Sequence, residues 1–250
     1  MCGRYTLKTD PGRIEKHFGL DHLPPLKPRY NLAPTQEGLV IRPGDHPGTR
    51  TAALLRWGLI PHWARDTASL PLLINARSET AATRPAFRDA LRHRRCLVPA
   101  DGFYEWARRD GTKRPFRFVI GDDELFAMAG LWDRWHPPGA PPDQAIETFT
   151  ILTTAANEVL APYHDRMPVI LAPDFYDDWL NPMLTAPDAI ERLLKPCPAT
   201  HMAAHAVSPR VNDVHNDDPA CLDPSDTPEA PRPPDQAPSG QLDLDLGFEA

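Results

Sequence analysis

The second residue of the chain is a cysteine, and a cysteine at an N-terminus has a reactivity that other residues lack. Met1 precedes Cys2, and an initiator methionine is removed when the second residue is small. Removal would leave an α-amine with an ordinary pKa of about 8 beside a thiol with one of about 8.5. The amine can condense with an aldehyde to an imine, and the thiol can then close a five-membered thiazolidine. Taken alone, Cys2 is more simply a chance cysteine at a frayed end, so this chemistry needs partners.

Polar residues that could assist such chemistry occur in compact groups along the chain. Asn75 and Arg77 are two residues apart, so both side chains point the same way if the segment is extended. Glu105 is flanked by aromatic residues, whose desolvation would raise its pKa toward neutrality and suit it to general acid/base work. Position 164 is a histidine, a residue type whose ordinary pKa lies near neutrality. Imine formation needs such groups, because water must leave and the amine must lose a proton.

Motifs spread over residues 1–215 resemble, in sequence and in order, the SOS-response-associated peptidase (SRAP) family, the abasic-site processing proteins. The matching segments are Met1–Tyr5, Tyr30–Thr35, Trp57–Gly58, Asn75–Thr80, Cys96–Trp106, Ala129–Trp132, Leu152–Asn157, His164–Leu171 and Val207–Asn212. The resemblance implies an α+β fold in which mainly antiparallel strands form a barrel-like core with a few peripheral helices. It implies no metal and no organic cofactor.

The same resemblance implies four catalytic residues. Cys2, freed of Met1, would attack the ring-opened sugar aldehyde of an abasic site in single-stranded DNA and form a covalent thiazolidine. Asn75 would hold the N-terminal amine or the sugar oxygen. Glu105 would be the general acid/base, and His164 would assist sugar ring opening and reversal of the crosslink.

Five further residues are implied as DNA contacts. Arg4, Arg77 and Arg166 would bind phosphates that flank the lesion, and Arg84 is a further phosphate candidate. Trp63 would stack near the gap that the missing base leaves. A single strand offers bases to stack on and phosphates to hold, which fits aromatic residues interleaved with arginines.

Other interpretations of Cys2 stay open at this point. The family name indicates a peptidase, whose narrow form is autocatalytic removal of Met1, although an ordinary methionine aminopeptidase could do the same. N-terminal-nucleophile glutamine amidotransferases also begin Met-Cys-Gly, but that activity leaves Glu105 and His164 without a purpose, and the chain has no second, synthetase-like domain. A binding-only module would hold single-stranded DNA reversibly, in a salt-sensitive manner.

The helices and strands that must position these residues can be predicted from helix caps, apolar runs and turn residues in the sequence. Asp10 is a candidate cap for a helix that begins at Pro11 and ends at Gly19. Apolar runs predict strands, and two later segments have helical spacing. The predicted strands are Thr51–Trp57, Arg95–Pro99, Phe103–Trp106, Phe116–Ile120, Leu125–Leu131 and Thr148–Thr154, and the later helices are Asp174–Leu180 and Ala186–Leu194. Gly121–Glu124 is a candidate hairpin turn. The mixture favours an α+β layout.

Composition divides the chain into a body and an acidic tail. The net charge of −7 comes mainly from residues 221–250, which hold seven acidic residues and one arginine and so contribute −6. Residues 216–240 contain seven prolines and six acidic residues, so we expect a body over 1–215 and a disordered tail over 216–250. Gln241–Phe248 resembles the short motif by which bacterial proteins dock onto the DNA sliding clamp. Four scattered cysteines and no apolar run of membrane length favour a cytoplasmic monomer, associated with the nucleoid when bound to DNA.

Overall fold

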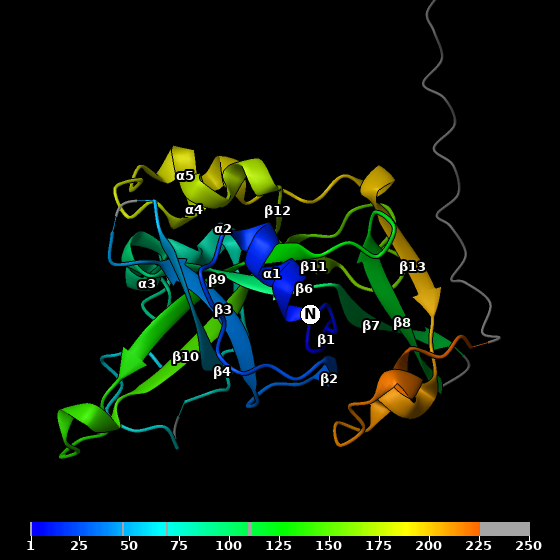
Figure 1. Ribbon diagram of the computed structural model, residues 1–250, viewed down its shortest axis with the longest axis horizontal. Helices are drawn as coiled ribbons and strands as arrows, with labels where there is room; N and C mark the ends of the chain where they lie inside the picture. The colour runs from blue at the N-terminus through cyan, green and yellow to red at the C-terminus, as the bar shows by residue number, and fades with distance from the viewer. Residues whose placement is uncertain (1, 47, 69, 110–111, 226–250) are drawn as a thin grey trace, which may run out of the picture.

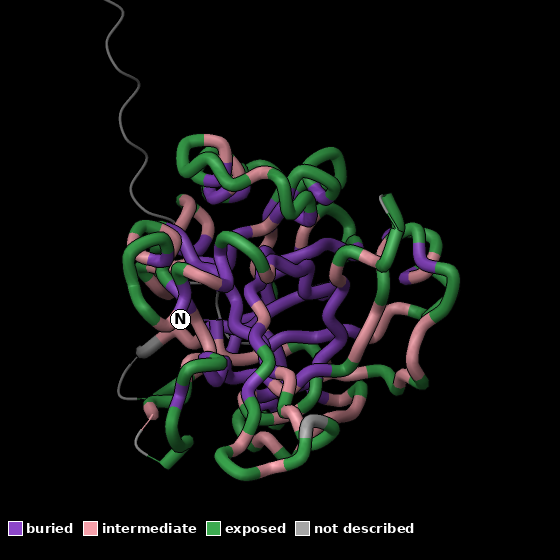
Figure 2. The backbone as a smooth tube through the Cα atoms, turned by 90° about the vertical axis from the view of Figure 1, so that its left-hand side faces the viewer, coloured by how far each residue is buried: buried purple, intermediate pink, exposed green. Residues whose placement is uncertain are grey.

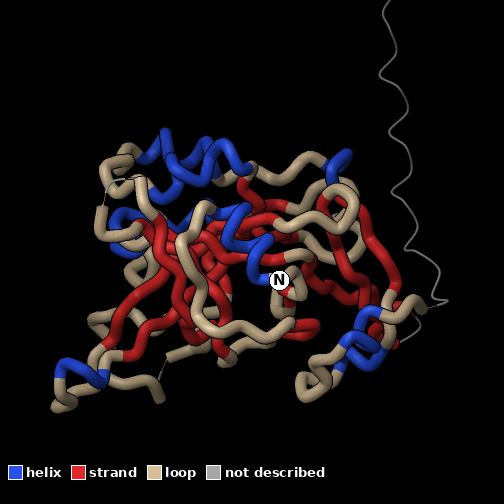
Figure 3. The backbone as a smooth tube through the Cα atoms, viewed as in Figure 1, coloured by secondary structure: helices blue, strands red, loops and turns tan. Residues whose placement is uncertain are grey.

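The structure is a computed structural model that describes residues 2–46, 48–68, 70–109 and 112–225. Strands dominate it, and short helices lie at its periphery (Figure 3). The strands are β1 (Tyr5–Leu7), β2 (Arg29–Leu32), β3 (Glu37–Pro43), β4 (Arg50–Trp57), β5 (Asn75–Arg77), β6 (Arg95–Ala100), β7 (Gly102–Arg109), β8 (Thr112–Ile120), β9 (Phe126–Trp135), β10 (Ile146–Ala155), β11 (Arg166–Pro168), β12 (Ile170–Leu171) and β13 (Met202–Ala206).

Five of these strands close into a barrel. β10, β4, β3, β6 and β9 pair in that order, and β9 pairs again with β10. The β10–β4 pairing is parallel and the others in the ring are antiparallel. Past the ring, β10 continues between two short strands, with Thr153 opposite Arg77 of β5 and Pro168 of β11. This end of β10 therefore brings β5 and β11 close together.

A second sheet packs beside the barrel, in the order β13-β8-β7-β1-β2 with every pairing antiparallel. In Figure 1 β1 lies between the barrel strands β3 and β4 and the strands β7 and β8. The helices cover the outside: α1 (Pro11–Phe18), α2 (Ser78–Ala81), α3 (Arg88–His93), α4 (Tyr176–Leu180) and α5 (Pro187–Leu193), with 3₁₀ turns at Pro142–Gln144, Pro173–Phe175, Ala199–His201, Pro209–Asn212 and Pro219–Leu222. No helix in the described part of the chain is long and apolar enough to cross a membrane.

Two large apolar clusters hold these layers together, and the buried backbone runs through the centre of the molecule (Figure 2). One cluster lies under the helices and includes Phe18 of α1 and Trp179 of α4. The other joins the barrel to the second sheet and includes Trp57, Phe103 and Cys2. Cys2 is therefore part of the core and not part of a frayed terminus.

The α+β prediction with a barrel of mainly antiparallel strands is confirmed, and each predicted strand and helix is present with shifted ends. Asp10 caps α1 by accepting from the Gly12 N–H at 2.9 Å, and Gly19 ends the helix with φ +61°. The predicted hairpin at Gly121–Glu124 is wrong, because β8 and β9 belong to different sheets. The turn is instead the crossover between the sheets.

The body also extends further than the sequence indicates. Residues 216–225 were expected to be disordered, yet Cys221 is fully buried and Asp217 binds β2. Residues 216–225 have the polar, proline-containing composition of a linker. They are nevertheless ordered against the body, because Asp217 accepts hydrogen bonds from backbone N–H groups of β2. Residues 226–250, including the clamp-like segment Gln241–Phe248, lie outside the described residues.

Candidate functional site

The segment that runs from Cys2 through β1 is fixed by a buried carboxylate at its far end. Asp101 is fully buried and accepts from the Thr6 hydroxyl at 2.6 Å. Its other oxygen accepts from the backbone N–H groups of Lys8 and Thr9 at 2.6 and 2.8 Å. Because a buried carboxylate is stable only when its oxygens are satisfied, these bonds determine where β1 lies. The Arg4 carbonyl accepts from the Tyr104 N–H at 3.0 Å and continues the pairing toward Cys2.

Cys2 itself is fully buried in this chain, which retains Met1. Its thiol lies 3.9 Å from the Arg4 carbonyl oxygen, and its own carbonyl accepts from Asn75 Nδ2 at 2.9 Å. Burial raises the pKa of the thiol well above its ordinary value, and the nearby carboxylate of Glu105 raises it further. The thiol is therefore protonated and shielded from solvent.

Asn75 reaches Cys2 because β5 is extended. Asn75 and Arg77 share one side of the strand, and Ala76 between them is fully buried. The conditional prediction that their side chains point the same way is thus confirmed. Arg77 is exposed, so its guanidinium faces solvent beside the site.

Glu105 lies on β7 and is 6% exposed. Burial raises the pKa of this carboxyl, and the nearby His164 acts in the opposite direction. A carboxylic acid that holds its proton closer to neutrality can donate that proton and later take it back, which is the behaviour expected of a general acid/base.

His164 lies half-buried at the start of the turn into β11. Its Nδ1 accepts from the Arg166 N–H at 2.9 Å and lies 2.8 Å from a carboxylate oxygen of exposed Asp165. Cys2, Asn75, Glu105 and His164 thus come together as predicted, and we call these four residues the Cys2 site.

The two arginines nearest this site are engaged within the protein. Arg166 forms a two-pronged ion pair with Glu79, at 2.6 and 2.8 Å, and also donates to the Thr153 carbonyl. Arg4 donates to Asn31 Oδ1 at 2.8 Å and to the Val211 carbonyl at 2.9 Å. A phosphate contact by either residue would replace or share these bonds.

Arg4 belongs to a bracket that sequence reasoning missed. Asn31 is fully buried, and its amide donates to the carbonyls of Val211, Asp213 and Asn216 at 2.8–3.2 Å. Asp217 accepts from the N–H groups of Tyr30 and Asn31 at 2.5 and 2.8 Å. We call these residues, with Arg4, the C-terminal bracket. It ties residues 211–217 to the segment that carries Cys2.

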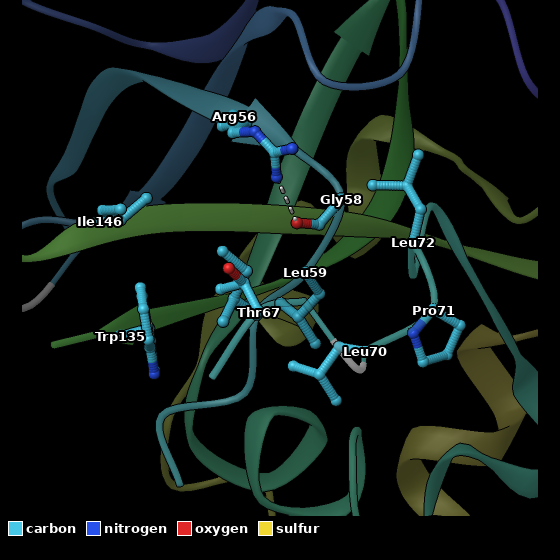
Figure 4. A pocket seen from close by; sticks show the side chains of 10 residues that line it. Arg56, Gly58, Leu59, Thr67, Leu70, Pro71, Leu72, Trp135 and Ile146 are labelled. Carbon is cyan, nitrogen blue, oxygen red and sulfur yellow. Dashed lines mark hydrogen bonds between the residues drawn. The ribbon is translucent and has the colours of Figure 1, made fainter. Parts of the chain in front are cut away.

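Within the described residues, no hydrogen bond or ion pair joins Trp63 or Arg84 to the Cys2 site. Trp63 is 50% exposed and its indole N–H donates to the Pro85 carbonyl at 3.3 Å, which places it beside the segment that contains exposed Arg84. A separate hollow of about 300 Å³ is lined mainly by apolar residues, among them Leu59, Leu72 and Trp135. Figure 4 shows Arg56 turned toward the Gly58 carbonyl at its edge, and none of the predicted site residues lines it.

In the described part of the chain no group of three His, Cys, Asp or Glu side chains is arranged to hold a metal ion.

Comparison with curated proteins finds relatives that match nearly the whole body. The chain is 43% identical over 227 residues to the abasic site processing protein YoqW of Bacillus subtilis, which covers 89% of this chain and 99% of that protein. It is 33% identical to YedK of Escherichia coli, covering 86% and 96%, and 33% identical to HMCES of Gallus gallus, covering 79% and 66%. The curated names of these relatives all state abasic site processing.

Solved structures give the same result for the fold. A protein from Bacteroides thetaiotaomicron superposes with a TM-score of 0.77 at 27% identity, covering 90% of this chain and all of that one. One from Bordetella bronchiseptica gives 0.72 at 33% identity, covering 83% and all of that chain. The family model described as SOS response associated peptidase matches residues 1–214. On these grounds the chain belongs to the SOS response associated peptidase (SRAP) family.

Proposed function

We propose that the chain binds single-stranded DNA at abasic sites and joins Cys2 covalently to the sugar aldehyde, shielding the lesion during the response to DNA damage. The observation that carries the proposal is the convergence of Asn75, Glu105 and His164 on the second residue of the chain. The names of the relatives support the substrate.

The proposed reaction begins with the loss of Met1, because an amide nitrogen cannot form an imine. The freed amine of Cys2 adds to the aldehyde carbon, and Glu105 donates a proton to the hydroxyl group that leaves as water. The thiol then adds to the carbon of the imine, and its proton passes to the nitrogen. One C–N and one C–S bond form, and one water is released. His164 assists opening of the sugar ring and, in the reverse direction, release of the DNA.

Asn75 is proposed to fix the main chain of Cys2 during these steps. Its amide already donates to the Cys2 carbonyl, so the amine that replaces the Met1 peptide bond starts from a defined position. Alignment of this kind lowers the barrier by removing the entropy cost of bringing the reacting groups together.

Removal of Met1 by the same residues is a narrower part of the proposal. The Cys2 thiol would attack the Met1 carbonyl, so that the acyl group moves from nitrogen to sulfur, and water would then release free methionine. Glu105 and His164 would move the protons. A refolded protein that retains Met1 tests this step, since methionine should be released without any aminopeptidase and not from Glu105→Gln.

The test of the main proposal is intact-mass spectrometry after incubation with a single-stranded oligonucleotide that contains one abasic site. We expect an adduct of the protein without Met1, equal to the summed masses less one water, and none with Cys2→Ala or with an intact oligonucleotide. Complete removal of Met1 without an adduct would reject the mechanism. Release of ammonia from glutamine would then favour an amidotransferase, and salt-sensitive binding alone would favour a binding module.

For the tail we propose docking of Gln241–Phe248 into a groove of the DNA sliding clamp, with the proline-rich residues before it as a tether. Clamp pull-down with the full chain and with a chain that lacks residues 241–250 checks this. Equal recovery of the clamp would reject it.

A further inference from the structure

A polar hollow of about 660 Å³ lies beside Trp63, and no residue of the Cys2 site lines it. His62, Trp63, Thr83, Pro85, Arg88 and Arg92 line it, and we call it the Trp63 hollow. The half-exposed indole forms part of its wall. A large apolar ring that remains this exposed beside arginine side chains offers a stacking surface, because its face is not used by the core.

The wall of this hollow is held in place by buried groups. The N–H of His62 and its Nδ1 lie 2.9 and 3.0 Å from Asp133 Oδ2, and Asp133 is only 3% exposed. Arg94 Nε lies 3.1 Å from the other oxygen of the same carboxylate. On the opposite side, Pro85 holds the Trp63 indole. The hollow is therefore formed before any ligand arrives, which reduces the entropy cost of binding.

Two arginines that line the Trp63 hollow are available to bind an anionic ligand. Its one lining carboxylate, Asp89, accepts from Arg94, and this hydrogen bond holds the pKa of Asp89 below its usual range. Arg88 and Arg92 are four residues apart on α3 and so lie on one face of the helix. Both are exposed, and neither pairs with an acidic side chain within the described residues. Two such guanidinium groups suit a phosphate.

The Trp63 hollow and the Cys2 site are joined by one short stretch of chain. It runs from Asn75 along β5 past exposed Arg77, through the single turn of α2, to Thr83 in the wall of the hollow. Thr83 is eight positions after Asn75, so the two places are at most about 28 Å apart along the chain. Single-stranded DNA sites commonly occupy about 4–16 nucleotides, so one strand can reach both.

We propose that the Trp63 hollow binds an intact nucleotide of the strand whose abasic site occupies the Cys2 site. The base stacks on Trp63, and a phosphate lies between Arg88 and Arg92. The inference rests on the proposed function, since it assumes that the strand is held at Cys2. It adds a second point of attachment, made by residues that take no part in the covalent chemistry.

Oligonucleotides of different length test this inference. In a Cys2→Ala background, which leaves binding reversible, Arg88→Gln/Arg92→Gln is compared with Arg13→Gln/Arg192→Gln, which removes two exposed arginines from α1 and α5. The strands carry one abasic site, with one to eight nucleotides on its 5′ side or its 3′ side. We expect the first pair to weaken binding about tenfold once the strand is long enough to reach the hollow from one side. The shortest strands should bind both pairs alike.

The salt dependence should change in parallel. Losing two phosphate contacts is expected to reduce the slope of log Kd against log salt by about 1.4, because each contact on single strands contributes about 0.7. Equal affinity at every length, or an equal loss with the control pair, would overturn the inference. Failure of the proposed function looks different, because the chain with Cys2 intact would then form no adduct on any strand.

Discussion

The Cys2 site and the Trp63 hollow are built in opposite ways. At the Cys2 site the thiol is fully buried and the carboxyl of Glu105 nearly so, and burial raises the pKa of both groups. In the Trp63 hollow the aromatic ring is half exposed, and two arginines face solvent. A reaction that moves protons benefits from desolvation, whereas recognition of a phosphate backbone needs cations that the phosphates can reach.

Because the two regions are built differently, we expect the affinity for DNA and the rate of crosslinking to depend on different residues. Changes at the Cys2 site should alter the rate of crosslinking with little effect on affinity, and changes in the Trp63 hollow should do the reverse. The following predictions test this separation, beginning with the largest effect.

Cys2→Ser should abolish the stable adduct but preserve the imine. Serine at position 2 still yields a free amine when Met1 is removed, but its hydroxyl is a much poorer nucleophile than a thiolate and closes no thiazolidine. We expect an adduct only when borohydride is present to reduce the imine. Mass spectrometry with and without the reductant measures this, and a stable adduct without borohydride would show that the thiol is dispensable.

Glu105→Gln should lower the rate of crosslinking by about 10²–10⁴-fold at saturating DNA, because the amide cannot donate and recover a proton. It should also change the dependence of stability on pH. The raised pKa means that folded Glu105 binds its proton more tightly than the unfolded chain does, so its ionisation destabilises the fold as pH rises past the ordinary carboxyl pKa.

The variant should therefore gain stability relative to the wild type at pH 8 and not at pH 4. Denaturant titrations at both pH values provide the measurement. An equal difference at the two pH values would mean that Glu105 is not held protonated by its surroundings.

Trp63→Ala should weaken reversible binding to a long strand about tenfold, since stacking of a base contributes about 1–3 kcal/mol. The rate of crosslinking at saturating DNA should stay within twofold of the wild type. Trp63→Phe keeps an aromatic face and should recover part of the affinity. A large fall in the saturating rate would instead place Trp63 next to the reacting sugar and remove the separation between the two regions.

The sequence predicts those elements of the fold whose determinants are local in the chain, and it predicts long-range strand pairing poorly. The long strands of the barrel carry continuous apolar runs, and the caps of α1 are local, so both were predictable. The pairing of β7 with β8 was not predicted, because the sequence analysis placed a hairpin turn at Gly121–Glu124 instead. Local chain chemistry identifies a turn but does not determine which strands pair across it.

The residues of the candidate site also differ in whether a sequence motif predicts them. Cys2, Asn75, Glu105 and His164 were predicted as a group because motifs that resemble a family carry them. The C-terminal bracket had no comparable signal, since Asn31 mostly contacts backbone carbonyls about 180 residues away, and any residue type supplies a carbonyl. Of the residues that line the Trp63 hollow, only Trp63 is among the predicted DNA contacts, because Arg88 and Arg92 belong to no motif that the sequence analysis identifies.

The smallest effect should come from the C-terminal bracket, which supports the Cys2 site from outside. Asp217→Ala removes the acceptor for two backbone N–H groups on the edge of β2, which should cost about 1–3 kcal/mol of stability. Because Asn31 also holds Arg4, the segment that carries Cys2 should become less well positioned, and the saturating crosslinking rate should fall by less than tenfold.

Asp217→Asn keeps one carbonyl oxygen and should retain most of the rate, although it weakens the ion pair with Arg29. Amide hydrogen exchange at Tyr30 and Asn31 reports directly on the bracket and should accelerate in the alanine variant more than in the asparagine variant. If exchange accelerates while the rate of crosslinking is unchanged, the bracket contributes to stability only. Positioning of Cys2 would then depend on the bonds that Asp101 makes at the other end of β1.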